Sequence, residues 1–273
     1  MIKKGKIGWA IIGTILGILF LSPFYIVFVN SLKTQKGIFI NVMGLPSKEY
    51  FTLKNYTQAF IELDFFRSFS NSLLITLSST AVIVVFASMA AWMMVRTKSK
   101  LSTLLFFIFA GAMLIPFQSV MLPLINIMGK LGLLNRIGII FMYLGFGSSL
   151  SIMLYHGFIK GIPLELEEAA ILDGCNVFQV FWYIVFPILK PITVTVCILN
   201  IMWIWNDFLL PQLVINRPEW HTIPLKMFYF FGQYSKRWDL ALAGLIIAMV
   251  PIILFYFIAQ KHIVKGVTQG SIK

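Results

Sequence analysis

The sequence has few charged residues, and acidic residues are the scarcest of them. Only 12% of its 273 residues are charged, with 10 Asp and Glu against 22 Lys and Arg, whereas soluble domains carry about 25% charged residues. The apolar fraction is 59% and the mean hydropathy is +0.88. A soluble domain of this length could not hide so much apolar surface. The composition excludes a soluble enzyme and predicts one integral membrane unit.

The chain has only two cysteines, Cys175 and Cys197. Two cysteines cannot form a disulfide framework. Neither belongs to a CxxC motif or has a histidine partner, so we expect no zinc or other metal site. We interpret both side chains as reduced thiols that pack as small, nearly apolar groups.

The excess of basic residues does not form the continuous stripe that nucleic-acid binding needs. The basic residues lie in short clusters beside the apolar runs, which is typical of membrane topology. We therefore expect no nucleic-acid partner. The clusters are Lys3, Lys4 and Lys6, then Arg96, Lys98 and Lys100, then Lys261 and Lys265.

The sequence also lacks two kinds of energy-coupling site. It contains no G-x-x-x-x-G-K-[ST] phosphate loop; Gly129-Lys130-Leu131 comes nearest and lacks the hydroxyl residue. Any ATPase must then be a separate chain. Proton-driven carriers use series of Asp, Glu and His within their spans, but here His156 lies near the end of one apolar run and Asp207 follows another. No catalytic constellation appears either.

Six apolar segments are long enough to cross a membrane as helices, which takes about 20 residues. We therefore predict an all-α integral membrane protein with six transmembrane helices. The first segment is longer than the core of a cleavable signal peptide, so we expect it to be retained. The third contains Pro116 and Pro123 and is predicted to be kinked or broken. The segments are 8–29, 72–95, 101–128, 137–159, 184–205 and 240–260.

Residues 161–191, between the fourth and fifth segments, predict a short helix–turn–helix outside the bilayer. Pro163 suits the first position of a helix, and Gly174 can adopt the left-handed conformation that ends one. Asn176 with Gln179 is a capping pair for a second helix, over about 178–186. The opening turns of the first helix are acidic, which suits the helix dipole. These acidic residues are Glu165, Glu167 and Glu168.

Two interpretations of this helix–turn–helix are open. It could dock onto a partner protein, because its small residues allow close approach and a carboxylate can pair with an arginine. It could also rest on the lipid headgroups. Anionic lipids favour basic residues over acidic ones, so the acidic residues favour docking.

The motif Glu168-Ala169-Ala170-x3-Gly174-x9-Ile184-x-Phe186-Pro187 resembles the EAA loop of membrane subunits in bacterial ABC importers. The family pattern is E-A-A-x3-G-x9-I-x-L-P, and only Phe186 departs from it. Further landmarks resemble the smaller permease of carbohydrate importers, similar to the maltose and multiple-sugar systems. They are Ser22-Pro23-Phe24, Asn30-Ser31-Leu32-Lys33, Trp205-Asn206-Asp207-Phe208, Trp220-His221-Thr222-Ile223-Pro224, Ala243-Gly244 and the tail 264–270.

The resemblance implies an orientation. Lys and Arg divide evenly between the two sides of the membrane, so charge alone leaves the topology open. In the family the EAA loop lies in the cytoplasm, in a cleft of the ATPase, which implies cytoplasmic termini in a multi-pass bacterial inner-membrane protein. The implied coupling residues are Glu168, Ala169, Ala170, Asp173, Gly174, Ile184 and Pro187. An extended C-terminal tail would contact the ATPase through Lys265, Gly266, Gln269 and Gly270, the alternative being a frayed chain end.

The resemblance also implies three regions and a set of partners. Residues 1–67 would hold the first span and an outer loop, 68–260 the five-span importer domain with the loop 161–191, and 261–273 the tail. This chain would be one of two different permeases of a sugar importer, and a dimeric ABC ATPase would bind ATP and Mg. An extracellular or periplasmic sugar-binding protein would deliver substrate, facing the outer loop 210–239. Asn200 and Asn206 are candidate substrate contacts or packing residues. The alternative function is a self-sufficient channel or secondary carrier.

Overall fold

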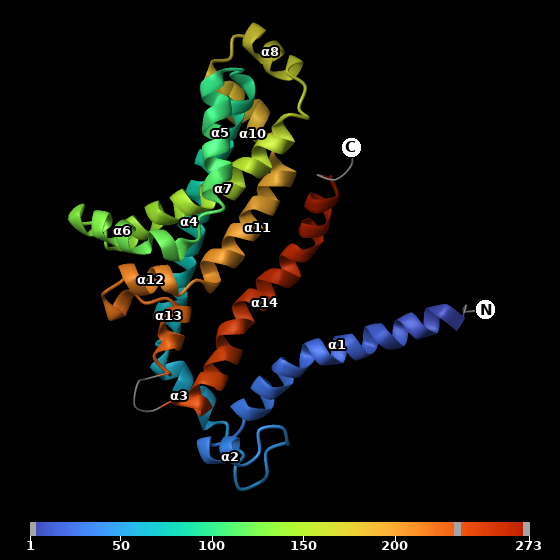
Figure 1. Cartoon of the computed structure of the whole chain (residues 1–273), viewed down its shortest axis with the longest axis vertical. Coiled ribbons are helices and arrows are strands. Elements are labelled where there is room, and N and C mark those ends of the chain that lie inside the picture. Colours follow the sequence, from blue (N-terminus) through green and yellow to red (C-terminus); the bar gives the residue numbers. More distant parts are fainter. Residues whose placement is uncertain (1–3, 232–235, 270–273) are drawn as a thin grey trace. The chain divides into compact units, whose positions relative to one another are not determined.

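The computed structural model describes residues 4–231 and 236–269 and is built from helices (Figure 1). Over these ranges the only β-type pairings are two isolated bridges, Lys33 with Phe51 and Phe231 with Lys236. The helices are α1 (Lys4–Ser31), α2 (Gln35–Ile40), α3 (Lys54–Glu62), α4 (Phe65–Arg96), α5 (Lys100–Ala112), α6 (Phe117–Lys130), α7 (Arg136–Ile159), α8 (Glu165–Leu172), α9 (Val177–Gln179), the π-helix η1 (Val180–Val185), α10 (Phe186–Ile188), α11 (Lys190–Asn206), α12 (Leu209–Val214), the 3-10 helix η2 (Pro218–Trp220), α13 (Ile223–Phe228) and α14 (Trp238–Gln269).

Four helices are long and apolar enough to cross a membrane without interruption. Two further pairs of helices pass the same test but are sharply bent, so the chain has up to six spans. The prediction of an all-α membrane protein is confirmed. The four uninterrupted segments are Gly8–Ser31, Phe65–Arg96, Arg136–Ile159 and Trp238–Ile258, and the bent pairs are Lys100–Ala112 with Phe117–Lys130 and Val177–Ile188 with Lys190–Asn206.

The two bent pairs refine the predicted third and fifth spans. The third is broken, as expected, and the two helices meet at 108°. The break lies directly before Phe117, where Pro116 precedes α6, whereas Pro123 is inside that helix. The predicted fifth span, 184–205, crosses the second bend, because α11 begins at Lys190 after a bend of 78° from Val177–Ile188. Prolines 187 and 191 flank this bend, and each lacks the N–H that would continue the helical ladder.

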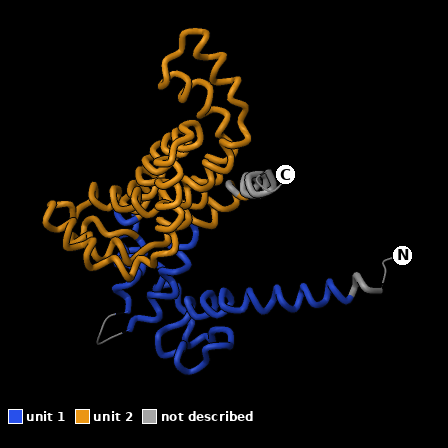
Figure 2. The backbone as a smooth tube through the Cα atoms, turned by 45° about the horizontal axis from the view of Figure 1, so that its top comes forward, with its two compact units in different colours: residues 1–68, 223–251 blue, residues 69–222, 252–273 orange. Residues whose placement is uncertain are grey.

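The contact pattern divides the chain into two compact units (Figure 2). Unit 1 comprises Met1–Ser68 and Ile223–Pro251, and unit 2 comprises Phe69–Thr222 and Ile252–Lys273. The sequence predicts different boundaries, with regions 1–67, 68–260 and 261–273. The C-terminal helix α14 continues through position 260 without a break.

Small residues allow the helices of unit 2 to pack closely. In the apolar windows of α4 and α7, 44% and 50% of the residues are buried, and several of these are serine, alanine or glycine. A Cβ atom at Gly147 would lie 2.5 Å from Ile83 Cδ1 and 2.7 Å from Asn200 Oδ1. Asn200 donates to Ser151 Oγ at 3.0 Å. Close backbone approach and buried polar pairs are typical of helix contacts in membranes.

In unit 1, the first span ends in a buried polar cluster. Lys33 is 2% exposed and donates from Nζ to Asn30 Oδ1 at 3.0 Å and to the Asn41 carbonyl oxygen at 2.6 Å. The Asn55 amide donates to the carbonyl oxygens of Ser31 and Lys33. These bonds fix the loop that follows the span. The span itself has none of its apolar window buried against the described chain.

The prediction of an extended C-terminal tail is wrong over the described residues. Lys265, Gly266 and Gln269 belong to α14, which continues as a helix to Gln269. Only one glycine, Gly266, occurs between positions 261 and 269, and one glycine costs a helix about 1 kcal/mol. Gly270 lies outside the described residues.

We predict that Gly138→Ala destabilises the chain, because a Cβ atom there would collide with the carbonyl oxygen of Leu133. The Gly138 N–H also donates to Asn135 Oδ1, the cap of this helix, at 3.0 Å. We expect a loss of about 1–3 kcal/mol, typical of overpacking, measured as a lower midpoint of thermal unfolding in detergent. Gly145→Ala, in the same helix, has open space around it and is the matched control. An equal midpoint for the two variants would contradict the prediction.

Candidate functional site

The segment from α8 to α10 forms one end of unit 2 (Figure 1). Helix α8 begins at Glu165, two residues after Pro163, so Pro163 precedes the first helical residue instead of occupying it. The three acidic residues lie in the first turn, as predicted. Gly174 has φ = +88°, which confirms the left-handed helix end. The N–H groups of Gly174 and Cys175 there donate to the carbonyl oxygens of Ile171 and Ala170.

The second helix of the segment begins at the predicted capping box. Gln179 N donates to Asn176 Oδ1 at 3.0 Å, and Asn176 N donates to Gln179 Oε1 at 2.8 Å. One turn later the backbone widens into the π-helix η1, in which Phe186 N donates to the Phe181 carbonyl oxygen. Pro187 follows directly and has no N–H to donate. Short π-helical stretches are frequent at functional sites.

The Glu167 carboxylate is buried and fastens α8 to the end of α4. Glu167 is 4% exposed. Trp92 Nε1 donates to its Oε2 at 2.9 Å, and Arg96 donates to its Oε1 from Nε at 2.9 Å and from Nη2 at 2.7 Å. The same guanidinium donates to the Ile162 carbonyl oxygen at 3.1 Å. Charge-assisted bonds of this kind are about twice as strong as neutral ones, so the carboxylate sets the position of α8.

The Trp92 ring extends this anchor to the second helix. Its centroid lies 5.4 Å from that of Phe181 in η1, and Phe181 is fully buried. Both helices of the segment are therefore attached to α4. The sequence predicts Glu167 in an acidic first turn and Arg96 in a basic cluster, but it does not predict that they pair. The available signal was the spacing of Trp92 and Arg96, which are four residues apart and share one face of α4.

The structure places the predicted coupling residues mainly on the surface of the segment. Glu168, Ala169, Asp173, Gly174 and Pro187 are exposed. Ile184 is half-buried and Ala170 is 6% exposed. Glu168 forms no ion pair within the described residues. Hence Glu167 points into the unit, and the neighbouring Glu168 is free to meet another molecule.

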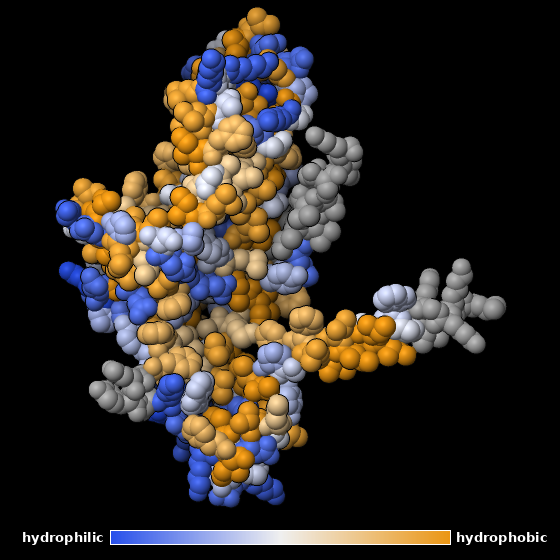
Figure 3. Space-filling view, in the orientation of Figure 1, coloured by the Kyte–Doolittle hydropathy of each residue, from blue (hydrophilic) through white to orange (hydrophobic). Residues whose placement is uncertain are grey.

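Large apolar side chains are also exposed on this segment, beside its hydrophilic residues (Figure 3). Leu172 is 88% exposed and Phe178 is 66% exposed. Exposed apolar residues that cluster and have polar neighbours mark interaction surfaces. We call these residues the apolar surface of the α8 segment: Leu164, Leu166, Ile171, Leu172, Val177 and Phe178.

The two candidate substrate residues differ in their surroundings. Asn200 is 5% exposed, and its amide donates to Ser151 Oγ and the Val196 carbonyl oxygen, which favours the packing role. Asn206 is exposed and donates to the Met202 carbonyl oxygen. Its neighbour Asp207 accepts a 2.9 Å bond from Tyr143. Burial raises the pKa of the Asp207 carboxyl, although bonds from Tyr143 and the backbone oppose the shift.

The loop before α13 has an anchor of its own within unit 2. The guanidinium carbons of Arg136 and Arg217 lie 4.9 Å and 4.8 Å from the centroid of Trp220. Asn71 donates to the carbonyl oxygens of Glu219 and His221 and accepts from Arg136 Nη2. Cation–π contacts of this kind stabilise by about 0.5–2 kcal/mol each. Trp220 was a landmark of the resemblance, but the sequence did not predict these partners.

Apolar spans joined to an anchored helical segment with an exposed face define a multi-span helical membrane protein. The chain belongs to the family described as "Binding-protein-dependent transport system inner membrane component", whose pattern matches residues 83–269. This match includes all of the α8 segment. The chain is thus a transport subunit and a multi-pass inner-membrane protein. Members of this family work with an ATPase and a binding protein.

Curated relatives match nearly the whole chain. It is 50% identical over 262 residues to the probable starch degradation products transport system permease protein AmyC of Thermoanaerobacterium thermosulfurigenes, covering 96% of this chain and 95% of the relative. It is 34% identical over 281 residues to the multiple sugar-binding transport system permease protein MsmG of Streptococcus mutans, covering 100% of both. The melibiose/raffinose/stachyose import permease protein MelC of Bacillus subtilis is 34% identical over 253 residues, 92% of this chain and 91% of the relative.

A solved structure has the same fold. It is the crystal structure of a bacterial ABC transporter involved in the import of the acidic polysaccharide alginate. The TM-score is 0.76 at 24% identity, and the match covers 96% of this chain and 98% of that chain. The helical fold of this chain is therefore that of the matched chain in this transporter.

We predict that removing Arg96 costs about 3–5 kcal/mol, since the Glu167 charge then stays buried and unpaired, and that removing Glu167 costs less, since Arg96 is 18% exposed and keeps its bond to Ile162. Glu167→Leu and Arg96→Met should each lower the thermal midpoint of the purified chain. The double variant should lose less than the sum of the two, because neither charge is then left alone. Strictly additive losses would show that the two side chains do not interact.

Proposed function

We propose that this chain is one of two different permease subunits of an ATP-driven ABC importer that moves a sugar or oligosaccharide by alternating access. Family membership carries the transport role. Relatives named for starch degradation products, multiple sugars and melibiose support a carbohydrate substrate. The particular observation that supports coupling is the α8 segment, which is anchored through buried Glu167 and presents Glu168 outward.

The ATPase in this proposal is a separate dimeric protein that binds ATP and Mg. The absence of a phosphate loop from the sequence supports this division of labour. An extracellular or periplasmic sugar-binding protein delivers the substrate to the side opposite the α8 segment. The family's dependence on a binding protein supports this partner.

In this proposal, the attachment of α8 to α4 transmits movements of the ATPase to the membrane spans. Glu168 pairs with a cationic residue of the ATPase, while Ala169 and Gly174 allow its surface to approach closely. A displacement of α8 is passed to α4 through Glu167, Trp92 and Arg96. ATP binding then needs only to favour one of two conformations through different contacts at this surface. Asp173, Ala170, Ile184 and Pro187 complete the coupling residues.

The orientation in this proposal puts the α8 segment and both termini in the cytoplasm. Arg96, Lys98 and Lys100 lie between α4 and α5, and Lys160 lies at the end of α7. All four residues flank the spans at the end that carries α8. Short basic connections of this kind favour the cytoplasmic side, which supports the orientation that the sequence alone left open.

The C-terminal contact and the substrate contacts are part of the same proposal. Lys265, Gly266 and Gln269 contact the ATPase from a helix, with Gly270 just beyond the described residues. Asn206 is the better candidate for a substrate contact because its side chain is exposed, whereas Asn200 is occupied by packing.

Glu168→Lys tests the coupling. We expect the variant to reach the membrane and assemble, because Glu168 is exposed, but to lower ATP-dependent sugar uptake by roughly tenfold or more, the equivalent of one lost charge-assisted contact. Uptake by cells and ATP hydrolysis by the purified complex are measured together. Glu49→Lys makes the same charge change in the exposed loop between α2 and α3 and should leave uptake unchanged.

Normal uptake by an assembled Glu168→Lys complex would refute the coupling role. A separate result bears on the function itself. If the purified chain moves sugar in vesicles without an ATPase, it is a self-sufficient carrier.

Leu172→Asp tests the apolar surface of the α8 segment. The side chain is 88% exposed, so folding should be unaffected, while a charge in a protein interface should weaken ATPase co-purification about tenfold. Leu45→Asp, at a position that is 74% exposed in another loop, should not change it. ATPase recovery is quantified by mass spectrometry after affinity purification in mild detergent. Equal recovery from the two variants would contradict the prediction.

A further inference from the structure

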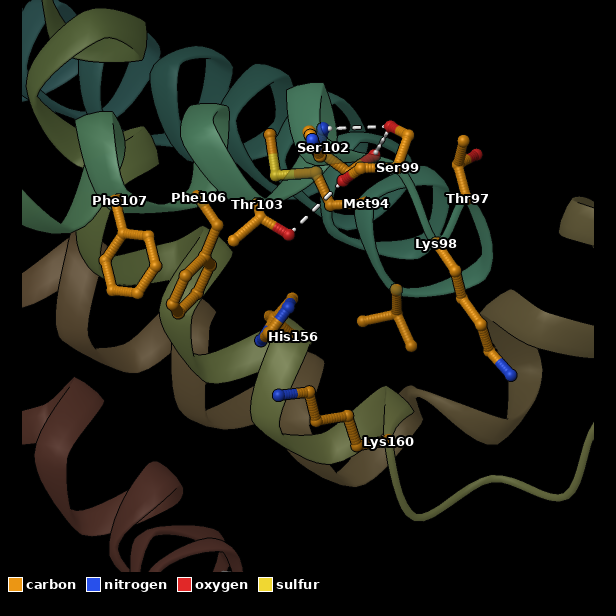
Figure 4. Close-up of a pocket in the computed structure, with 12 residues that line it drawn as sticks. Met94, Thr97, Lys98, Ser99, Ser102, Thr103, Phe106, Phe107, His156 and Lys160 are labelled. Atoms are coloured by element: carbon orange, nitrogen blue, oxygen red, sulfur yellow. Dashed lines mark hydrogen bonds between the residues drawn. The ribbon is translucent and has the colours of Figure 1, made fainter.

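A cavity of about 520 Å³ lies in unit 2 between the start of α5 and the end of α7 (Figure 4). Its polar lining includes the lysines 98, 100 and 160 and the hydroxyl residues Ser99, Ser102 and Thr103. Its apolar lining includes Met94, Val95, Phe106 and Phe107. We propose that this cavity binds the phosphate headgroup of an anionic phospholipid.

The three lysines that line the cavity favour the binding of an anion. Lys98, Lys100 and Lys160 approach it from three different helix ends. Over residues 4–231 and 236–269, no ion pair joins any of these lysines to a carboxylate. By contrast, the nearby Arg96 is already paired with Glu167. Three ammonium groups around one cavity repel each other, and a phosphate between them would turn this repulsion into attraction.

Hydrogen-bond donors complete the polar part. Ser99 caps α5 by accepting from Ser102 N at 3.1 Å, and its hydroxyl donates to Ser102 Oγ at 3.3 Å. Ser102 therefore keeps its own hydroxyl proton for another acceptor. The cavity also includes the first turn of α5, a helix of 13 residues, whose free N–H groups and dipole favour an anion. The helix dipole and the lysines therefore favour a ligand of the same, negative charge.

The apolar part of the cavity favours a lipid over a free phosphate. Phe106 stacks on His156 with centroids 4.0 Å apart, and Figure 4 shows this pair beside Lys160. Helix α5 buries none of its residues within the described chain. Leu104 and Phe107 on it are 56% and 64% exposed. Acyl chains can lie along this face while the headgroup stays among the lysines, as in basic pockets between transmembrane helices.

This inference uses only the membrane location of the chain. It depends neither on the coupling role of the α8 segment nor on the substrate. A failure of the following test would leave the proposed function untouched.

The test is native mass spectrometry of the full chain with its co-purifying partners, after lipid removal in mild detergent. Phosphatidylglycerol or phosphatidylcholine with identical acyl chains is then added back. We expect one phosphatidylglycerol per chain, bound at least about tenfold more tightly than phosphatidylcholine. Lys98→Gln/Lys100→Gln/Lys160→Gln should weaken phosphatidylglycerol binding about tenfold or more. Lys36→Gln/Lys48→Gln/Lys54→Gln removes the same charge from exposed positions and should change binding less than about twofold.

Several outcomes would overturn the proposal. Equal binding of the two lipids would exclude headgroup recognition. Equal losses of phosphatidylglycerol binding in the two triple variants would show that the lipid responds to the net charge of the protein and not to this cavity. Displacement of the lipid by low millimolar inorganic phosphate would identify a soluble anion as the ligand. Loss of the ATPase from the first triple variant with unchanged lipid binding would assign the lysines to a protein contact. The single variant Lys160→Gln leaves two lysines in place and should give an intermediate loss.

Discussion

The buried carboxylate of Glu167 is the interaction on which the arrangement of the α8 segment depends. It accepts bonds from Trp92 and Arg96, which lie on one face of α4, and the Trp92 ring packs against Phe181 of η1. A buried charge is costly unless its partners surround it. This cost makes the attachment specific, because any displacement of α8 away from α4 would leave the carboxylate and the guanidinium unpaired. The α8 segment is thereby attached directly to the end of α4.

Prolines at the two bends determine where the candidate spans are interrupted. Backbone groups within lipid must be paired inside a helix, yet Pro116, Pro187 and Pro191 interrupt the helical ladder. The chain responds with bends of 108° and 78°. The second bend separates α11, which has 17 residues and is near the shortest length for a span, from the helices that lead back to α8. The π-helix η1 lies directly before α10 at this bend.

Local chemistry in the sequence predicted local structure well. Gly174 and the Asn176–Gln179 pair are recognisable because a left-handed turn and a capping box each need particular residues within four positions. The Glu167–Arg96 pair was not predictable, because 71 residues separate its members. The sequence also does not show which of the adjacent glutamates, Glu167 or Glu168, faces the protein interior. The extended tail was wrong because polar residues at 261–269 are compatible with a helix that continues from an apolar span. Asn200 also shows that an amide near a span end can serve packing.

The claim at the centre of this account is that the exposed face of the α8 segment meets an ATPase and not the lipid surface. Photo-crosslinking in native membranes tests it directly, with p-benzoylphenylalanine in place of Phe178, which is 66% exposed. Phe39, which is 68% exposed in α2, serves as the reference position. The account predicts an adduct with a phosphate-loop ATPase from position 178 and none from position 39. Adducts with lipid alone from position 178 would contradict it.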